Sequence, residues 1–388
     1  MLTFEAFTGI NNVLPEHRMK GNDLLVAADV DIGLTGEITR RGGFTEASDT
    51  CHKNIHQAEG FMLATTGSAL VAIHSGGAQH VIHPALGPGR VWYCNLPDGR
   101  TTYSNGLIHG VTDGLTGQDR SVPAPAGLGV PGDAFGELFP GSYRYHLTHV
   151  RLADRLESPA ISSEPISIGQ GGFRLDGLPQ LDGHAINVHL SGQDGEGAYL
   201  AGVTTSGSFE YTGNNAALVL PCRTLGALPF PVGTFTAFWR GRVLTAVGNV
   251  LWASRPSAPH LADWRDFKQL VGGITAIQPV DDGVYVGTDK ELHFLAGTTW
   301  DALALVPTRR GPVVPGSGVQ APGDRLLLGE GTGSGTAMVC IAGGEIVAGF
   351  NGGQTSSLTG NRYKTAATEV CATFREIDGI PQYLAVPQ

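Results

Sequence analysis

The stretch FTAFWRGRVLTAVGNVLWASRP, from Phe235 to Pro256, carries the clearest fold signal in the chain. Its apolar and polar residues come in short alternating runs, which are broken at Arg240-Gly241 and again at Gly248-Asn249. Alternation with a period of two is typical of β-strands, and glycine in a two-residue turn allows the backbone angles that a tight hairpin needs. The stretch therefore predicts three antiparallel strands, whose tryptophan side chains are available to pack against a neighbouring sheet.

The same pattern of short strands cut by turn residues occurs along most of the chain, at residues 59–82, 89–111, 274–297, 324–350 and 371–387. The unit recurs about every 40 residues, the length of one propeller blade, although no strict motif repeats. Sheets with two apolar faces are stable when they pack face to face around an axis. We therefore expect an all-β fold, a β-propeller of about six blades. Residues 24–41 are expected to pair with the C-terminal hairpin around Asp378-Gly379 and close the ring.

One region breaks this rhythm and predicts a separate module. Residues 141–223 contain long alternating strands, and proline-rich stretches flank them at residues 122–132 and 228–233. We interpret the region as an inserted β-sandwich of the fibronectin type III kind. The expected organisation is a first propeller part at residues 1–140, the insert at 141–223 and a second propeller part at 224–388. Only PHLADWRDF, residues 259–267, has the spacing of a short helical piece.

Composition narrows the class of protein further. The 388 residues include 57 Gly and 23 Pro, 41% are hydrophobic and 15% are charged, a balance opposite to that of disordered chains. A net charge of -10 argues against a sequence-independent DNA clamp but suits the wall of a passage for DNA. The 5 Cys are widely spaced, which disfavours a disulfide framework or a structural zinc site and fits a reducing cytoplasm. We expect no signal peptide and no membrane segment.

Four stretches together resemble a family of bacteriophage virion proteins, the propeller-bearing nozzle or tail-accessory proteins of short-tailed phages. The first is FTGINNVLPEH with LLVAADVDIGLTGEITRRGGF, and the second is SYRYHLTHVRLADRLESPAIS. The third combines residues 238–267 with residues 274–297, and the fourth is GFNGGQTSSLTGNRY at residues 349–363. The resemblance covers most of the chain and is carried by the overall pattern of these segments.

The resemblance implies a structural virion protein with no enzymatic role, no cofactor and no catalytic, cofactor-binding or metal site. Its expected partners are copies of itself in a ring, usually a hexamer, and other tail proteins such as an adaptor, fibres or a tail tip. Genomic DNA passes through the ring during ejection, and the protein reaches the virion tail after synthesis in the cytoplasm of the host bacterium. The alternative is a carbohydrate-binding or carbohydrate-cleaving propeller used in receptor recognition, and a third possibility is a monomeric scaffold that binds peptides.

The sequence also holds residues with the chemistry of possible sites. The pairs His80/His83 and His146/His149 have metal-like spacing, but in strands such pairs point to opposite faces. The stretches CHKNIH (51–56), DIGLTGEI (31–38) and SGQDGEG (191–197) lack a full ligand set, and GEGTGSGTAM (329–338) lacks the lysine of a phosphate loop. We interpret them as surface or turn segments.

Acidic, aromatic and basic residues give three further expectations. The pairs Asp281/Asp282 and Asp263/Asp266 are expected to serve a turn and a helix cap, although two facing carboxylates would suit glycoside hydrolysis. The tryptophans at 239, 252, 264 and 300 are expected to pack between blades. Arg309 and Arg310 form the basic spot with which an acidic partner would interact.

Overall fold

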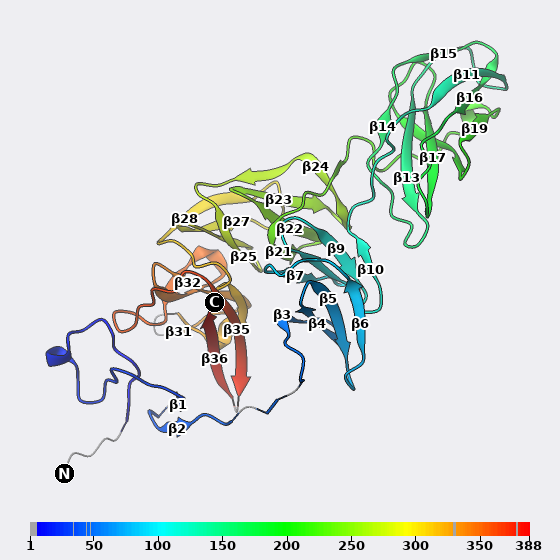
Figure 1. The fold of residues 1–388 in the computed structure, drawn as a ribbon. Helices are drawn as coiled ribbons and strands as arrows, with labels where there is room; N and C mark the ends of the chain where they lie inside the picture. The colour runs from blue at the N-terminus through cyan, green and yellow to red at the C-terminus, as the bar shows by residue number, and fades with distance from the viewer. Residues whose placement is uncertain (1–5, 34, 44, 47, 329–330, 378) are drawn as a thin grey trace.

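The strands form antiparallel sheets of four or five strands that stand side by side around a common centre, and a second β-unit projects from one side (Figure 1). This computed structural model describes residues 6–33, 35–43, 45–46, 48–328, 331–377 and 379–388. The predicted all-β class is confirmed, and the arrangement of the sheets is propeller-like.

We call the sheets around the centre blades 1 to 5, in chain order. Blade 1 comprises β3 (Lys53–Gln57), β4 (Phe61–Thr66), β5 (Ala69–His74) and β6 (Gln79–His83). Blade 2 comprises β7 (Trp92–Asn95), β8 (Thr101–Ser104), β9 (His109–Thr112) and β10 (Gly117–Asp119). Blade 3 comprises β20 (Leu228–Pro229), β21 (Thr234–Trp239), β22 (Arg242–Val247), β23 (Val250–Arg255) and β24 (Ala258–Gln269).

The remaining blades follow the same strand order. Blade 4 comprises β25 (Ile274–Val280), β26 (Gly283–Thr288), β27 (Leu292–Ala296) and β28 (Ala304–Arg310). Blade 5 comprises β29 (Val319–Pro322), β32 (Thr336–Ala342), β33 (Glu345–Gly349) and β34 (Thr355–Ser357), and a small hairpin of β30 (Leu327–Leu328) and β31 (Gly331–Thr332) interrupts it. Four 3-10 turns are described, η1 (Glu16–Arg18), η2 (Asn215–Ala217), η3 (Gly323–Arg325) and η4 (Asn351–Gly353), and no described helix is long and apolar enough to cross a membrane.

The hairpin turns predicted in blade 3 are confirmed. Trp239 pairs with Arg242 across a two-residue turn, in which Arg240 has a φ of 47° and Gly241 a φ of 80°. Two successive residues with positive φ match the twist of the flanking strands, and glycine adopts such angles without strain. The turn therefore aligns the alternating apolar residues of β21 and β22 on the same faces of the sheet.

Apolar faces of adjacent blades pack against each other to form the core. One cluster joins blades 3 and 4 and contains Trp239, Leu244, Leu251 and Val284. A second cluster joins blades 4 and 5 around Phe294, whose side chain is fully buried. Burial of this apolar area is the main force that holds neighbouring blades together.

The helical piece predicted at residues 259–267 is wrong, because these residues lie within strand β24. The register between β23 and β24 shifts at two places, so β24 carries bulges that break strict alternation. A bulge inserts an extra residue and shifts the buried positions, which imitates the spacing of a helix. Asp263 and Asp266 do not cap a helix but pair with Arg255 and Arg242.

The predicted pairing between residues 24–41 and the C-terminal hairpin does not occur among the described residues. Strand β1 (Val30–Ile32) pairs with β2 (Ile38–Arg40), and β35 (Val370–Ile377) pairs with β36 (Ile380–Pro387) in a separate two-stranded sheet. The C-terminal hairpin itself is confirmed, although Asp378 at its tip lies outside the described residues. The strands of the N-terminal segment pair with each other and not with β36. In the described chain, β36 therefore has one edge without a partner strand.

The second unit contains two facing sheets with their own core. One sheet has β11 (Val130–Phe135), β16 (Gly171–Asp176) and β19 (Ser208–Tyr211), and the other has β14 (Ile161–Ser162), β13 (Tyr145–Arg151), β17 (His184–Ser191) and β18 (Ala198–Thr204). A short pair, β12 (Gly141–Tyr143) and β15 (Ile166–Ile168), accompanies them. Because β11 pairs with β16, the unit begins before residue 141, where we expected the boundary.

Buried histidines make the stability of this fold depend on pH. Burial and the charge of Arg120 lower the pKa of His109 from 6.5 to about 4. A histidine with a lowered folded pKa contributes stability above its unfolded pKa, and this contribution disappears as the pH falls towards the folded value. We expect the free energy of unfolding to decrease between pH 6.5 and pH 4, and His109→Gln to flatten that decrease in urea titrations at a series of pH values. An identical pH slope in the wild type and the variant would contradict the assignment.

Candidate functional site: the central cavity

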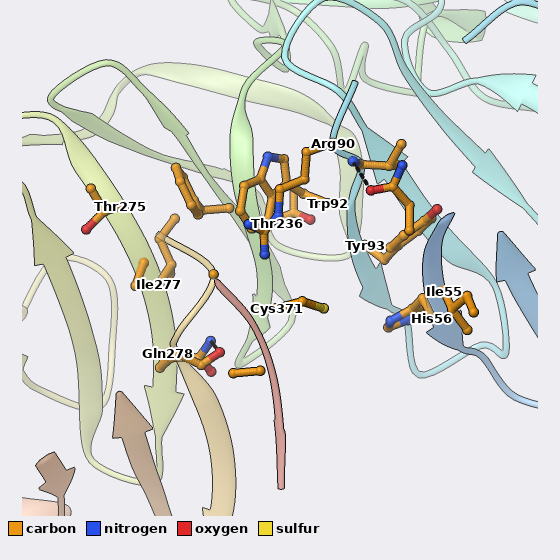
Figure 2. Close-up of a pocket in the computed structure, with 17 residues that line it drawn as sticks. Ile55, His56, Arg90, Trp92, Tyr93, Thr236, Thr275, Ile277, Gln278 and Cys371 are labelled. Atoms are coloured by element: carbon orange, nitrogen blue, oxygen red, sulfur yellow. Dashed lines mark hydrogen bonds between the residues drawn. The ribbon is translucent and has the colours of Figure 1, made fainter. Parts of the chain in front are cut away.

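The innermost strands of the blades converge on one cavity at the centre of the ring (Figure 2). It has a volume of about 240 Å³ and opens beside a second space of about 460 Å³. Residues from β3, β7, β21, β25 and β35 line it, so almost every sheet contributes to its wall. The cavity therefore exists only when the blades are assembled around the centre.

Bulges at the start of the innermost strands shape this wall. The registers of β3 and β21 shift at their first residues, where Asn54 has a φ of 51° and Phe235 a φ of 54°. Such bulges redirect side chains that regular pairing would place elsewhere. The ring of Phe235 lies against that of Trp92, with 4.1 Å between their centroids. The wall of the cavity thus includes an aromatic face contributed by blades 2 and 3.

Arg90 crosses from the entry of blade 2 to the C-terminal hairpin. Its guanidinium donates to the Glu369 carboxylate at 2.7 Å and to the Val370 carbonyl at 2.8 Å. The same group lies over the ring of Trp92, 4.3 Å from the centroid. Hydrogen bonds that involve a charged group are stronger than neutral ones, so Arg90 ties two parts of the ring that are distant in sequence.

Several polar atoms of the cavity have no protein partner. The hydroxyl oxygens of Tyr93, Thr236 and Thr275 are buried and make no hydrogen bond. Close by, His56 bonds to Asn95 at 2.8 Å and stacks on Tyr93, with 4.8 Å between the ring centroids. Burial, opposed by the Asn95 bond, lowers the pKa of His56. Buried hydroxyls need partners, so this wall is suited to ordered water or a small polar ligand.

The candidate metal pairs do not act as pairs. His80 lies in β6 and its ring is 5.2 Å from that of His74, whereas His83 accepts a hydrogen bond from the backbone of Ala85. His149 bonds to the backbone carbonyls of Pro123 and Pro179, and His146 does not share these partners. These contacts agree with the expectation that strand residues three apart face opposite ways.

The other candidate segments are turns or edges of strands. Residues 31–38 include the end of β1 and the start of β2, with Leu34 outside the described residues, and residues 191–197 contain the turn between β17 and β18. In the glycine-rich stretch 329–338, Gly329 and Glu330 lie outside the described residues, and the remainder contains β31 and the start of β32. Cys51 is exposed, while His56 of the same stretch belongs to the central cavity.

Some of the acidic and aromatic candidates link neighbouring blades, whereas Asp263, Asp266 and Trp252 make their contacts within blade 3. Asp281 accepts hydrogen bonds from Thr336 and Asn351 and so links blade 4 to blade 5. Trp239 and Trp300 are buried in the cluster between blades 3 and 4, as expected. Trp264, in contrast, is exposed, and its ring carries the Arg265 guanidinium at 4.4 Å.

The two basic candidates have different surroundings. Arg310 donates to the Thr355 hydroxyl at 3.0 Å and lies 3.9 Å from Glu345, so it bridges blades 4 and 5. Arg309 is exposed and has a φ of 58°. Of the two, Arg309 is the side chain that a partner would reach.

Sequence reasoning missed the residues of the cavity. Arg90, Tyr93, Thr236 and Thr275 belong to four different segments that only the ring brings together. What these residues share is a place near the start of the innermost strand of a blade, which is β7 in blade 2, β21 in blade 3 and β25 in blade 4.

Comparison with known proteins gives distant structural likenesses. No protein-family model and no curated protein matches the chain. Its structure is similar to virginiamycin B lyase from Staphylococcus aureus, with 11% identity, a TM-score of 0.32 and coverage of 84% of this chain and 92% of that one. It is also similar to the Pan2 WD40 domain from Neurospora crassa, with 9% identity, a TM-score of 0.35 and coverage of 87% and 86%. These likenesses assign neither an activity nor a ligand.

Proposed function

We propose that this chain is a structural protein of a bacteriophage tail, a nozzle or tail-tip component that assembles as a ring of identical subunits. The observation that carries the proposal is the N-terminal arm, residues 6–43, which lies outside the blades (Figure 1). An arm that extends from a rigid body and exposes apolar side chains is suited to contact a neighbouring subunit. The resemblance of four sequence stretches to tail nozzle proteins supports the same function.

The arm is anchored at one place and otherwise exposed. Asn12 exchanges hydrogen bonds with the backbone of Lys364, and Arg362 pairs with Asp23. Beyond this anchor the arm exposes apolar side chains, at Val13, Leu14, Leu25, Val26 and Ile38. A fixed base with an apolar surface would place the arm reproducibly against the next copy.

The finer architecture belongs to this proposal. We interpret the five blades and the β35–β36 hairpin as the six positions of one propeller, with the sixth built from two strands. The free edge of β36 offers unpaired backbone groups to which a strand of another chain can add. The second unit has the two facing sheets of a sandwich, which supports a fibronectin type III-like module.

In the proposed function the chain acts through its shape, as part of the wall around a passage, without catalysis and without a cofactor. The central cavity holds only about 240 Å³, which is too small for a DNA duplex, so genomic DNA would pass through the middle of the ring of subunits and not through a single propeller. The net charge of -10 suits a wall to which DNA does not adhere. Other tail proteins, such as an adaptor, fibres or a tail tip, would bind the outer loops, and the location would be the virion tail.

The arm provides the test of this assembly. We expect the wild-type chain to form rings, most often hexamers, in electron micrographs and in mass measurements of single particles. Val26→Asp places a charge on an apolar contact of the arm and should raise the concentration needed for half-assembly at least about tenfold, because a buried valine contributes about 1.5–3 kcal/mol. Melting of the monomer should not change, because Val26 is exposed in the monomer.

Val271→Asp is the matched control, because Val271 is 68% exposed, close to the 73% of Val26, but belongs to the loop before blade 4. It should assemble as the wild type does. A wild-type chain that stays monomeric at high concentration, or a Val26→Asp variant that assembles normally, would count against the arm as the assembly element.

The second candidate function is a carbohydrate-binding or carbohydrate-cleaving propeller. The central cavity favours it, because an aromatic face of Trp92 and Phe235 lies beside unpartnered hydroxyls, a combination that suits a sugar ring. Calorimetric titration with bacterial glycans distinguishes the two functions: saturable binding that Trp92→Ala abolishes would favour the sugar-binding function.

A further inference from the structure

Three side chains with metal-ligating atoms meet in the second unit, away from the central cavity. They are Glu157, in the connection between β13 and β14, His189 of β17, and Cys222, which follows β19. Their ligand atoms all lie within 4.8 Å of one another. A carboxylate, an imidazole and a thiol in one place form a mixed donor set of the kind that binds zinc.

The imidazole of His189 is buried and only partly satisfied. Its side chain is 3% exposed, its Nε2 atom lies 3.2 Å from Glu157 Oε1, and its Nδ1 atom makes no hydrogen bond. His146 faces His189 directly across the strand pair, and its buried Nε2 atom also has no partner. An unpartnered ring nitrogen in a protein interior is costly unless another group binds it.

The three side chains also interact electrostatically with one another. Burial disfavours the charged form of His189, but its interactions with Cys222 and Glu157 outweigh burial and raise its pKa to about 9. Burial raises the pKa of Cys222, but the interaction with His189 outweighs it, so the net shift is downward. Because an imidazole must be neutral to bind a metal, the positions and types of the donor atoms carry the case for a metal, and these charges do not.

Surrounding groups hold the carboxylate in position. Glu157 Oε1 accepts hydrogen bonds from the Thr148 hydroxyl at 2.5 Å and from the Asn187 amide at 3.0 Å. The backbone carbonyl of Glu157 bonds to His260 of blade 3 at 3.1 Å. Ligands that are themselves hydrogen-bonded are pre-oriented for a metal, and here the orientation also depends on contact with the propeller.

We propose that Glu157, His189 and Cys222 bind one divalent transition-metal ion of the zinc type. The ion would link β17, the 157 loop and the segment after β19, next to blade 3. Its role would be structural, to fix the second unit against the propeller. This inference is independent of the proposed tail function.

Cobalt reports on the site, because a cobalt–thiolate bond absorbs in the near ultraviolet. The full-length chain would be stripped with a chelator and titrated with Co²⁺ and then Zn²⁺. We expect one equivalent of Co²⁺ to bind, with a thiolate charge-transfer band that Zn²⁺ abolishes. Cys222→Ser should remove the band and weaken binding at least about a hundredfold, since even groups that only support ligands change affinity 10- to 100-fold.

Cys51→Ser is the matched control, because Cys51 is exposed and lies in a segment outside this cluster. It should keep the band and the affinity. Thermal melting of the metal-free variants confirms that they fold, and Zn²⁺ should raise the melting temperature of the wild type but not that of Cys222→Ser.

Three outcomes would overturn the proposal. The first is the absence of a charge-transfer band in the wild-type chain at stoichiometric Co²⁺, and the second is a band that Cys222→Ser retains. The third is alkylation of Cys222 by iodoacetamide at the same rate with and without Zn²⁺, which would mean that the cluster holds a reactive thiol and no metal.

Discussion

Replacing Phe294 by alanine should lower the free energy of unfolding by about 3–5 kcal/mol, the cost of removing a buried phenylalanine ring. The ring is fully buried between blades 4 and 5, with 4.7 Å between its centroid and that of Tyr285. Gly283 and Gly353 leave the space that it fills, since a Cβ at either position would lie 2.6 Å from a ring atom. Strands from two blades enclose the ring. If these strands moved in to fill the cavity left by the substitution, their contacts with each other would be broken. Urea denaturation followed by tryptophan fluorescence measures the loss.

Phe135→Ala is the matched control, because the same ring atoms are removed from a side chain that is 81% exposed. It should change the free energy of unfolding by no more than about 0.5 kcal/mol. Equal losses for the two variants would show that Phe294 does not hold the two blades together.

Gly316→Ala should have the second-largest effect, a loss of about 2–5 kcal/mol from steric overlap and backbone strain together. Gly316 has a φ of 75°, and a Cβ there would lie 2.1 Å from the Val370 carbonyl oxygen and 1.9 Å from an Arg90 nitrogen. The arginine can move, but the carbonyl belongs to the backbone of the C-terminal hairpin. The substitution would therefore push the hairpin away from the cavity, and both the melting temperature and the urea midpoint should fall.

Gly241→Ala separates the two causes of that loss. Gly241 has a φ of 80°, but a Cβ there would meet no atom within 4 Å. Its substitution should cost only the backbone strain, about 1–2 kcal/mol. If Gly316→Ala costs no more than Gly241→Ala, the close contact with Val370 has no energetic weight.

The sequence was a good guide to the strands because local chemistry determines them. Arg240-Gly241 and Gly343-Gly344 form the turns that their residue types predict, and the glycine residues there all have positive φ. The sequence misled where bulges intervene: in β24 an extra residue shifts the apolar positions and produced the helical prediction. The partner of the N-terminal strands was also mispredicted, because β1 finds its partner in β2, a few residues away.

The candidate sites could not be predicted, because they depend on contacts between distant segments. Arg90 meets Glu369 only when the ring brings the C-terminal hairpin back to blade 2. Cys222 is one of 5 widely spaced Cys, and nothing in its local sequence indicates that His189 lies beside it. A spacing rule finds ligands that are neighbours in a helix or loop, whereas here strand register and a long connection bring them together.

The position of the second unit has a consequence for how the chain folds. Blade 2 ends with β10 and blade 3 begins with β20, yet β7 and β21 lie next to each other at the cavity. The two segments must find each other across the whole intervening unit, and joining distant segments slows folding. If the second unit folds first, its sheets bring the points where the chain enters and leaves the unit towards each other. The effective separation between β7 and β21 then becomes shorter. Ribosome-bound or refolding chains should then acquire structure in this outlying unit before the ring closes.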